Sequence, residues 1–199
     1  MKRIYISADY AEDCGDRDVV LILHNWASDS KHKISFVDMA EVISGTVAND
    51  PDCRPCDLKA EFNRQINASS TVIFVVGDKT AKREAGCKCT FSNNALLRVC
   101  TPYKENRNGV KFCKYNSSKK AENDIGNINN YSYLEHEFRQ AAFKRKKIII
   151  LYNSTRKEQE WLPGYMRNYE NIAIPFWKKN VFNEKVGDYE SIKRALGVD

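Results

Sequence analysis

Residues 58–77 read LKAEFNRQINASSTVIFVVG, and this stretch decides the fold. Its first half places Leu58, Phe62 and Ile66 at helical spacing, which predicts a helix with one apolar face. Its second half contains residues 71–76, an uninterrupted apolar run typical of a strand that is covered on both faces. A helix that leads directly into such a strand predicts an α/β protein built around a parallel sheet.

The alternation of helix and strand continues on both sides of this stretch. It predicts about five parallel strands flanked by helices and joined by right-handed crossovers, in one domain covering residues 1–199. Two polar segments interrupt the alternation: a long loop before Leu58 and an insertion at about 79–130 that contains cysteines. Further strands are expected at 3–7, 34–37, 147–151 and 172–177, and further helices at 19–27, directly before 147, and at 189–196.

The composition is that of a folded protein with a mild positive charge. The chain has 199 residues, of which 42% are hydrophobic and 29% charged, and its formal charge is +6. The densest basic run, KRKK at 144–147, also suits a solvated helix end, so nucleic-acid binding is a minor alternative. Without a signal sequence or an apolar run long enough to span a bilayer, the sequence predicts a cytoplasmic protein with no membrane partner.

The seven cysteines are expected to be reduced thiols or metal ligands if the protein is cytoplasmic. A CxxC pair in the long loop and a CxC pair in the insertion could together hold a structural zinc ion, although unrelated thiols fit the pattern better. A dithiol oxidoreductase is a weaker alternative, because the CRPC stretch is placed in a loop that no thioredoxin-like strand precedes. The four candidate zinc ligands are Cys53, Cys56, Cys87 and Cys89.

Polar residues follow the expected strands, at the edge of a parallel sheet where ligands usually bind. The sequence has neither the glycine-rich dinucleotide fingerprint nor a phosphate-binding loop, so any nucleotide must bind by another scheme. The residues collected at this edge are Ser7, Asp9, Tyr10, Asp38, Gly77, Asp78 and Asn153.

The helix before residue 147 begins YLEHEF and carries two glutamates on either side of a histidine. Its spacing places Glu135 and Glu137 on opposite flanks of the buried stripe and points His136 away from it. Periodicity alone favours a surface role for Glu137, with a functional role as the alternative. The expected buried stripe consists of Leu134, Phe138, Ala141 and Ala142.

Several stretches in this order resemble one protein family. KRIYISADY, LILHNWA, FVDMAE, DLKAEFNRQINASSTVIFVVGDKT and YLEHEFRQAAFKRKKIIILYN are similar to segments of the TIR-like proteins of bacterial antiphage systems, in particular the ThsB-type component of Thoeris defence. About two thirds of the chain takes part in this resemblance. It implies a flavodoxin-like or TIR-like sheet, while the insertion at about 79–130 departs from shorter family members.

The resemblance also implies an activity, namely cleavage of NAD+ at the nicotinamide–ribose bond to give a cyclic, linear or conjugated ADP-ribose product. Glu137 then takes the place of the catalytic glutamate, Tyr133 replaces the usual tryptophan, and Glu61 is the rival candidate. No metal is required for this chemistry. The expected substrate-binding residues are Tyr5, Ser7, Asp9, Tyr10 and Asp38.

The partners that the resemblance implies are an effector protein that senses the product, a phage-derived trigger and further copies of the chain. The main alternative to an enzyme is the same fold acting as a non-catalytic interaction module, in which Glu137 is an ordinary surface residue. Loss of NAD+ turnover in Glu137→Gln, with the fold intact, would separate these two functions.

Overall fold

The computed structural model describes residues 2–9, 16–28, 34–38, 54–84 and 131–198, and for residues 54–57 it describes the backbone alone. The main elements are β1 (Lys2–Ser7), α1 (Asp16–Ala27), β2 (Ile34–Asp38), α3 (Arg54–Ala68), β3 (Thr71–Val76), α4 (Tyr133–Phe143), β4 (Lys147–Tyr152), β5 (Ile174–Pro175), β6 (Trp177–Lys179), β7 (Lys185–Gly187) and α5 (Tyr189–Leu196). Short 3-10 helices occur at η2 (Thr80–Lys82), η3 (Gln159–Trp161) and η4 (Gly164–Ile172).

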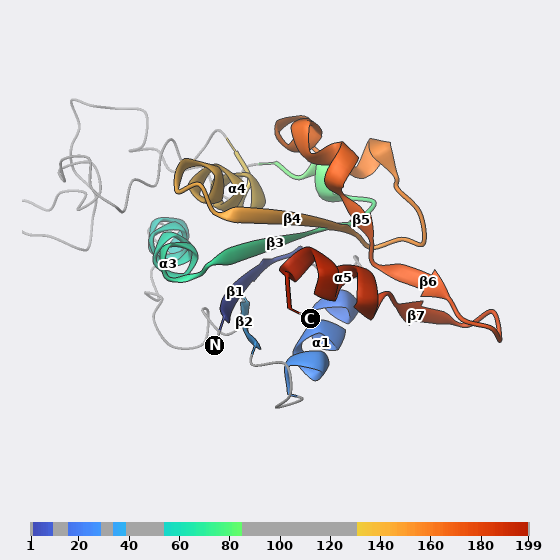
Figure 1. Cartoon of the computed structure of the whole chain (residues 1–199). Helices are drawn as coiled ribbons and strands as arrows, with labels where there is room; N and C mark the ends of the chain where they lie inside the picture. Colours follow the sequence, from blue (N-terminus) through green and yellow to red (C-terminus); the bar gives the residue numbers. More distant parts are fainter. Residues whose placement is uncertain (1, 10–15, 29–33, 39–53, 85–130, 199) are drawn as a thin grey trace, which may run out of the picture.

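Five of the described strands form one parallel sheet in the order β2-β1-β3-β4-β5. This is the flavodoxin-like strand order, and it confirms the α/β fold class predicted from the sequence. Helices α3 and α4 lie on one side of the sheet, and α1 and α5 on the other (Figure 1). The strand order reverses direction between β1 and β3, so the crevice for ligands is expected at their carboxyl ends.

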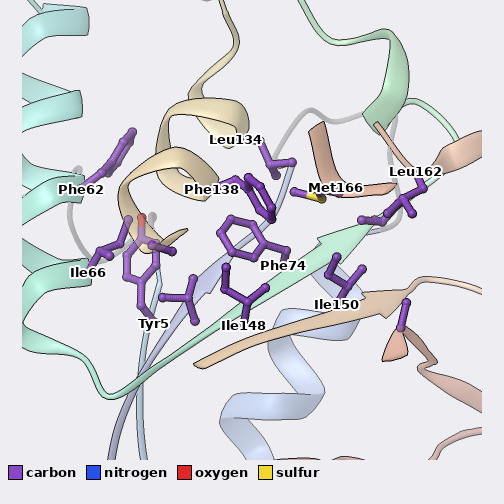
Figure 2. Packing of buried hydrophobic residues seen from close by; sticks show 14 of the residues in the cluster. Tyr5, Phe62, Ile66, Phe74, Leu134, Phe138, Ile148, Ile150, Leu162 and Met166 are labelled. Carbon is purple, nitrogen blue, oxygen red and sulfur yellow. The ribbon is translucent and has the colours of Figure 1, made fainter. Parts of the chain in front are cut away.

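Alternation along the strands divides the core into two layers. On β1, Tyr5 faces the cluster formed with α3 and α4, whereas Ile4 and Ile6 face the cluster formed with α1 and α5. Figure 2 shows the first of these clusters, in which Phe74 of β3 meets Phe138 of α4. Because strands β3 and β4 are covered on both faces, most of their residues form continuous apolar runs.

Helix α4 has well-defined ends that set it on the sheet. Ser132 is its N-cap, and the Ser132 hydroxyl accepts a hydrogen bond of 3.2 Å from the backbone N–H of Glu135. After the helix, Arg145 adopts a positive φ of 50°, which turns the chain sharply into β4. This short connection fixes which face of α4 meets the sheet.

Two boundaries differ from the sequence prediction. The prediction that the loop extends to Leu58 is wrong, because α3 already begins at Arg54. Pro55 is tolerated in the first turn of this helix, since backbone N–H groups there have no acceptor within the helix and the missing N–H of proline costs nothing. The single strand expected at 172–177 is also wrong. Ile172 ends η4, and the apolar run is divided between β5 of the main sheet and β6 of a separate hairpin with β7.

Some expectations fall on parts of the chain that the structure does not describe. Residues 85–130 of the insertion lie outside the described ranges, as do Tyr10, Cys53, Cys87 and Cys89, while the side chain of Cys56 is not described. The zinc hypothesis therefore stays a prediction. Within the described ranges, no helix has the length and apolar character needed to span a membrane.

Candidate functional site

Glu137 is the most unusual residue of α4, because its carboxyl group is buried in the protein. The side chain is 1% exposed and lies among the apolar residues that pack α4 on the sheet. Ala141, one turn later on the same helix, is also fully buried and leaves room for a longer neighbour. The expectation that favoured a surface position for Glu137 is therefore wrong.

Two hydroxyl groups of β1 hold this carboxyl group. The Tyr5 hydroxyl donates to Oε1 of Glu137, and the Ser7 hydroxyl donates to Oε2. Both donors are fully buried, and both point to the same face because they are two residues apart on a strand. Ser7 is the last residue of β1, so the contact lies at the carboxyl end of the sheet, beside the reversal of strand order.

Burial controls the electrostatics of this site. Removal from water raises the pKa of Glu137 to about 7, and the hydrogen bonds from Ser7 and Tyr5 lower it in part. The carboxyl group can therefore exchange its proton near neutral pH. Carboxyl groups with such properties are common among catalytic acids and bases, although buried structural networks also show them.

The neighbours of Glu137 on α4 have other roles. His136 is 3% exposed, so the expectation that it points away from the core is wrong; its Nε2 lies 2.9 Å from Oδ1 of Asn63 on α3. The reason is that α4 packs against α3 as well as the sheet, which buries a wider face than the expected stripe. Glu135 instead forms a surface ion pair of 2.6 Å with Arg139, and Ala142, expected in the stripe, is exposed.

The two expected aspartates do not join Glu137 in the described contacts. Asp38 pairs in register with Ile6, so it faces α1, where its Oδ2 lies 2.8 Å from Nε2 of His24. Asp9 forms an ion pair with Arg83, just after η2. Their proposed roles in substrate binding stay predictions.

Glu61, the rival catalytic candidate, belongs to a different network. It accepts hydrogen bonds from Arg64 and from Gln65 on α3, and Gln65 in turn accepts one from Arg3. The pKa of Glu61 is below its usual value: partial burial would raise it, but the contacts with Arg64 and Gln65 lower it by more. Glu61 thus lacks the buried, neutral-pH character of Glu137.

A second buried carboxyl group, Asp16, was not among the sequence candidates. Its side chain is 1% exposed. Burial raises the pKa of Asp16 to about 6, and a hydrogen bond of 3.0 Å from Asn153 offsets part of this increase. Its other oxygen, Oδ2, has no hydrogen-bond partner among the residues that the structure describes. The sequence showed only an acidic residue near a helix start, which the helix dipole explains, so local pattern could not reveal its burial.

A close approach fixes Asp16 at the end of the sheet. A Cβ atom at Gly77, directly after β3, would lie 2.6 Å from Oδ1 of Asp16, so only glycine fits there. The indole N–H of Trp177 donates to Oδ1 of Asn153 over 2.6 Å, which orients the Asn153 amide toward Asp16. Within the described ranges, no group of three or more potential ligands is arranged to hold a metal ion.

Together these features define an α/β protein of flavodoxin-like strand order whose described residues include three buried carboxyl groups near the carboxyl edge of the sheet, those of Asp16, Asp38 and Glu137. No protein-family model matches the sequence, and no curated protein matches it either. Among solved structures, the chain is similar to a crystal structure of a prokaryotic SEFIR domain, with 12% identity over 99% of this chain and 94% of that one. The TM-score of 0.49 is low, so the assignment of fold rests on the strand order alone.

Proposed function

We propose that the protein cleaves the nicotinamide–ribose bond of NAD+ and converts the ADP-ribose part into a signal nucleotide, with Glu137 as the catalytic residue. The observation that carries this proposal is the buried Glu137 carboxyl group, held by Tyr5 and Ser7 at the carboxyl end of β1. The resemblance of five sequence stretches to TIR-like antiphage proteins supplies the substrate class. The buried carboxyl group and the sequence resemblance both point to Glu137, and this agreement supports its proposed catalytic role.

The reaction requires few catalytic groups. The bond between ribose C1′ and the nicotinamide nitrogen breaks, and its electron pair leaves with nicotinamide, which needs no proton because its ring nitrogen is cationic in NAD+. Water, or another nucleophile such as a ring nitrogen of the adenine, then bonds to C1′ and releases a proton. A carboxylate near C1′ stabilises the oxocarbenium-like transition state and can orient the ribose hydroxyls.

In this proposal the described arrangement is the closed, inactive form of the site. Both carboxyl oxygens of Glu137 are occupied, by Tyr5 and by Ser7, and the side chain is 1% exposed. Catalysis therefore requires α4 and β1 to separate locally, so that ribose hydroxyls replace the protein hydroxyls. This fits a protein that rests inactive until a phage-derived trigger or self-association opens it, and whose product an effector protein reads.

A non-catalytic interaction module is the second candidate, and the same burial supports it. A carboxyl group whose two oxygens accept hydrogen bonds from hydroxyl groups can have a purely structural role, which here is to join α4 to β1. In that case NAD+ would remain intact under every condition. The two candidates make opposite predictions for one experiment.

The experiment is mass spectrometry of NAD+ after incubation with concentrated protein, with and without lysate from phage-infected cells. Glu137→Gln is the test variant, while Glu135→Gln on the same helix and Glu61→Gln at the rival position are matched controls. We expect nicotinamide release by the wild type and both controls and none by Glu137→Gln. Intact NAD+ in all samples would favour the interaction module, and loss of activity only in Glu61→Gln would move the catalytic role to α3.

A further inference from the structure

The β6–β7 hairpin extends away from the sheet and helices (Figure 1). Two exposed apolar side chains lie at its end. At its tip, Val181 is 94% exposed and Phe182 is 79% exposed. Isolated apolar residues are common on protein surfaces, but two adjacent ones at the end of a projecting hairpin form a ready contact point.

The tip is held in a defined conformation by Asn180. Its Oδ1 accepts hydrogen bonds of 2.9 Å from the backbone N–H groups of Phe182 and Glu184, and its Nδ2 donates to the Glu184 carboxylate over 2.7 Å. Asn183 supplies the positive φ of 63° that completes the turn. The two apolar side chains are therefore presented in a preorganised form, which lowers the entropy lost on binding.

Lysines surround the base of this tip. Lys179 and Lys185 are exposed on the two strands, and the Lys185 ammonium group lies 4.2 Å from the centre of the Trp177 ring. Lys178 is also exposed but pairs with Asp188 over 2.9 Å, and Glu184 adds one negative charge in the turn. The whole chain carries a formal charge of +6. Lys179 and Lys185 face each other in register, at the last strand positions before the turn that carries the apolar tip. When the tip enters the outer part of a bilayer, these two ammonium groups would lie at the level of the lipid phosphates.

We propose that this tip inserts Val181 and Phe182 into the surface of an anionic lipid bilayer, with the lysines at the level of the headgroups. A second copy of the chain fits the tip less well than an anionic bilayer does, because its apolar recess is bordered by a positive charge like those of the tip. The apolar recess between α1 and α5, which includes Trp26 and Ile192, is bordered by Lys193, of the same sign as the tip. The inference concerns a peripheral contact and replaces the expectation of no membrane partner, which considered spanning segments alone.

The test measures cosedimentation of the full chain with vesicles of phosphatidylcholine alone, or mixed in equal parts with phosphatidylglycerol. We expect binding to the anionic vesicles only, with weakening as salt rises. Phe182→Asp should weaken this binding roughly tenfold or more, because a buried phenyl ring is lost and a negative charge is added. The matched control is Leu21→Asp on α1, where the apolar side chain is 65% exposed, and it should bind like the wild type.

A direct readout of insertion completes the test. Phe182→Trp should show an additional indole emission that brominated lipids quench, beyond the quenching of the wild type. Circular dichroism would verify that each variant is folded. Absence of vesicle binding, equal binding to both vesicle types, or equal loss in Phe182→Asp and Leu21→Asp would overturn the proposal; loss of self-association in Phe182→Asp without any vesicle binding would point instead to a second copy as the partner.

Discussion

The Nδ2 atom of Asn153 lies 3.0 Å from Oδ1 of Asp16, and this hydrogen bond joins the end of β4 to the first turn of α1. It satisfies only one of the two oxygens of an almost completely buried carboxyl group, because Oδ2 has no partner in the described part of the chain. A buried charge with incomplete hydrogen bonding is costly, so this contact implies that the folded protein is less stable when Asp16 is ionised.

Replacing Asp16 by asparagine should therefore stabilise the protein at alkaline pH. Its folded-state pKa of about 6 lies above the usual 3.8, so its favourable contribution is present below pH 3.8 and is lost as pH rises through about 6. The gain in Asp16→Asn at pH 8 should be at most roughly 3 kcal/mol and should shrink at pH 4. Urea denaturation at both pH values measures it, and a variant less stable than wild type at pH 8 would contradict this account.

Glu137→Gln should also increase the free energy of unfolding at alkaline pH, and this gain should appear at a higher pH than in Asp16→Asn. The wild-type contribution of Glu137 is complete below pH 4.5 and is lost as pH rises through about 7. The glutamine amide has a similar shape and can keep contacts with Tyr5 and Ser7 without a buried charge. We expect the advantage of the variant over wild type in free energy of unfolding to grow between pH 5 and pH 8.5; an advantage that does not change with pH would show that Glu137 keeps an ordinary pKa.

The proposed reaction needs the ionised form of Glu137, and this fixes the direction of its pH profile. The kcat/KM for NAD+ cleavage should rise with pH and level off above the pKa of Glu137, which is about 7 while the carboxyl group is buried. Nicotinamide release at saturating trigger, measured across pH 5–9, checks this. A rate that falls over that range would mean that a protonated group other than this carboxylate controls the chemistry.

Tyr5→Phe should raise the pKa of Glu137 further, because it removes a donor that favours the charged form while the ring stays in place. We expect a loss of about 1.5–3 kcal/mol in stability at pH 8, typical of a hydrogen bond to a charged group. Tyr152→Phe is the matched control, since the buried Tyr152 hydroxyl has no hydrogen-bond partner within the described ranges. Equal losses in the two variants would indicate general disturbance of the core.

Gly77→Ala should be destabilising, because its methyl group would meet the Asp16 carboxyl group at 2.6 Å from Oδ1 and 3.1 Å from Oδ2. A cost of about 1–3 kcal/mol is typical of such overpacking. Gly164→Ala is the control, since no atom lies within 4 Å of a Cβ added there. Shortening Asp16 to alanine in the same chain should recover part of the loss, whereas strictly additive effects would place the strain elsewhere.

The sheet could be predicted from the sequence because strands buried on both faces leave continuous apolar runs. Residues 71–76 and 147–151 are of this kind, and the structure has strands at both. The apolar run at 172–177 misled the prediction, because hydrophobicity does not show that a chain leaves one sheet and enters a hairpin between Ile174 and Trp177.

The candidate site was only partly predictable. Tyr5 and Ser7 could be placed on one face of β1 by strand alternation, but no local pattern shows that Glu137 reaches them from α4, because that contact spans 132 residues of chain. The burial of two further residues likewise depends on neighbours that are distant in sequence. His136 contacts Asn63 of α3, and Asp16 contacts Asn153, which follows β4. The contact of Asp38 with His24 was not predictable either, because being at the end of a strand does not say which face a side chain takes.

Strand β1 serves the core and the site at once, since Ile4 and Ile6 pack under α1 while Tyr5 and Ser7 reach Glu137 from the other face. The proposed reaction and the centre of the fold would therefore depend on the same strand. A lineage that gave up the chemistry would need to change only position 137 to an apolar residue of similar size, and the loss of a buried charge would favour that change. Among descendants of such a chain, inactive members would be the more stable ones.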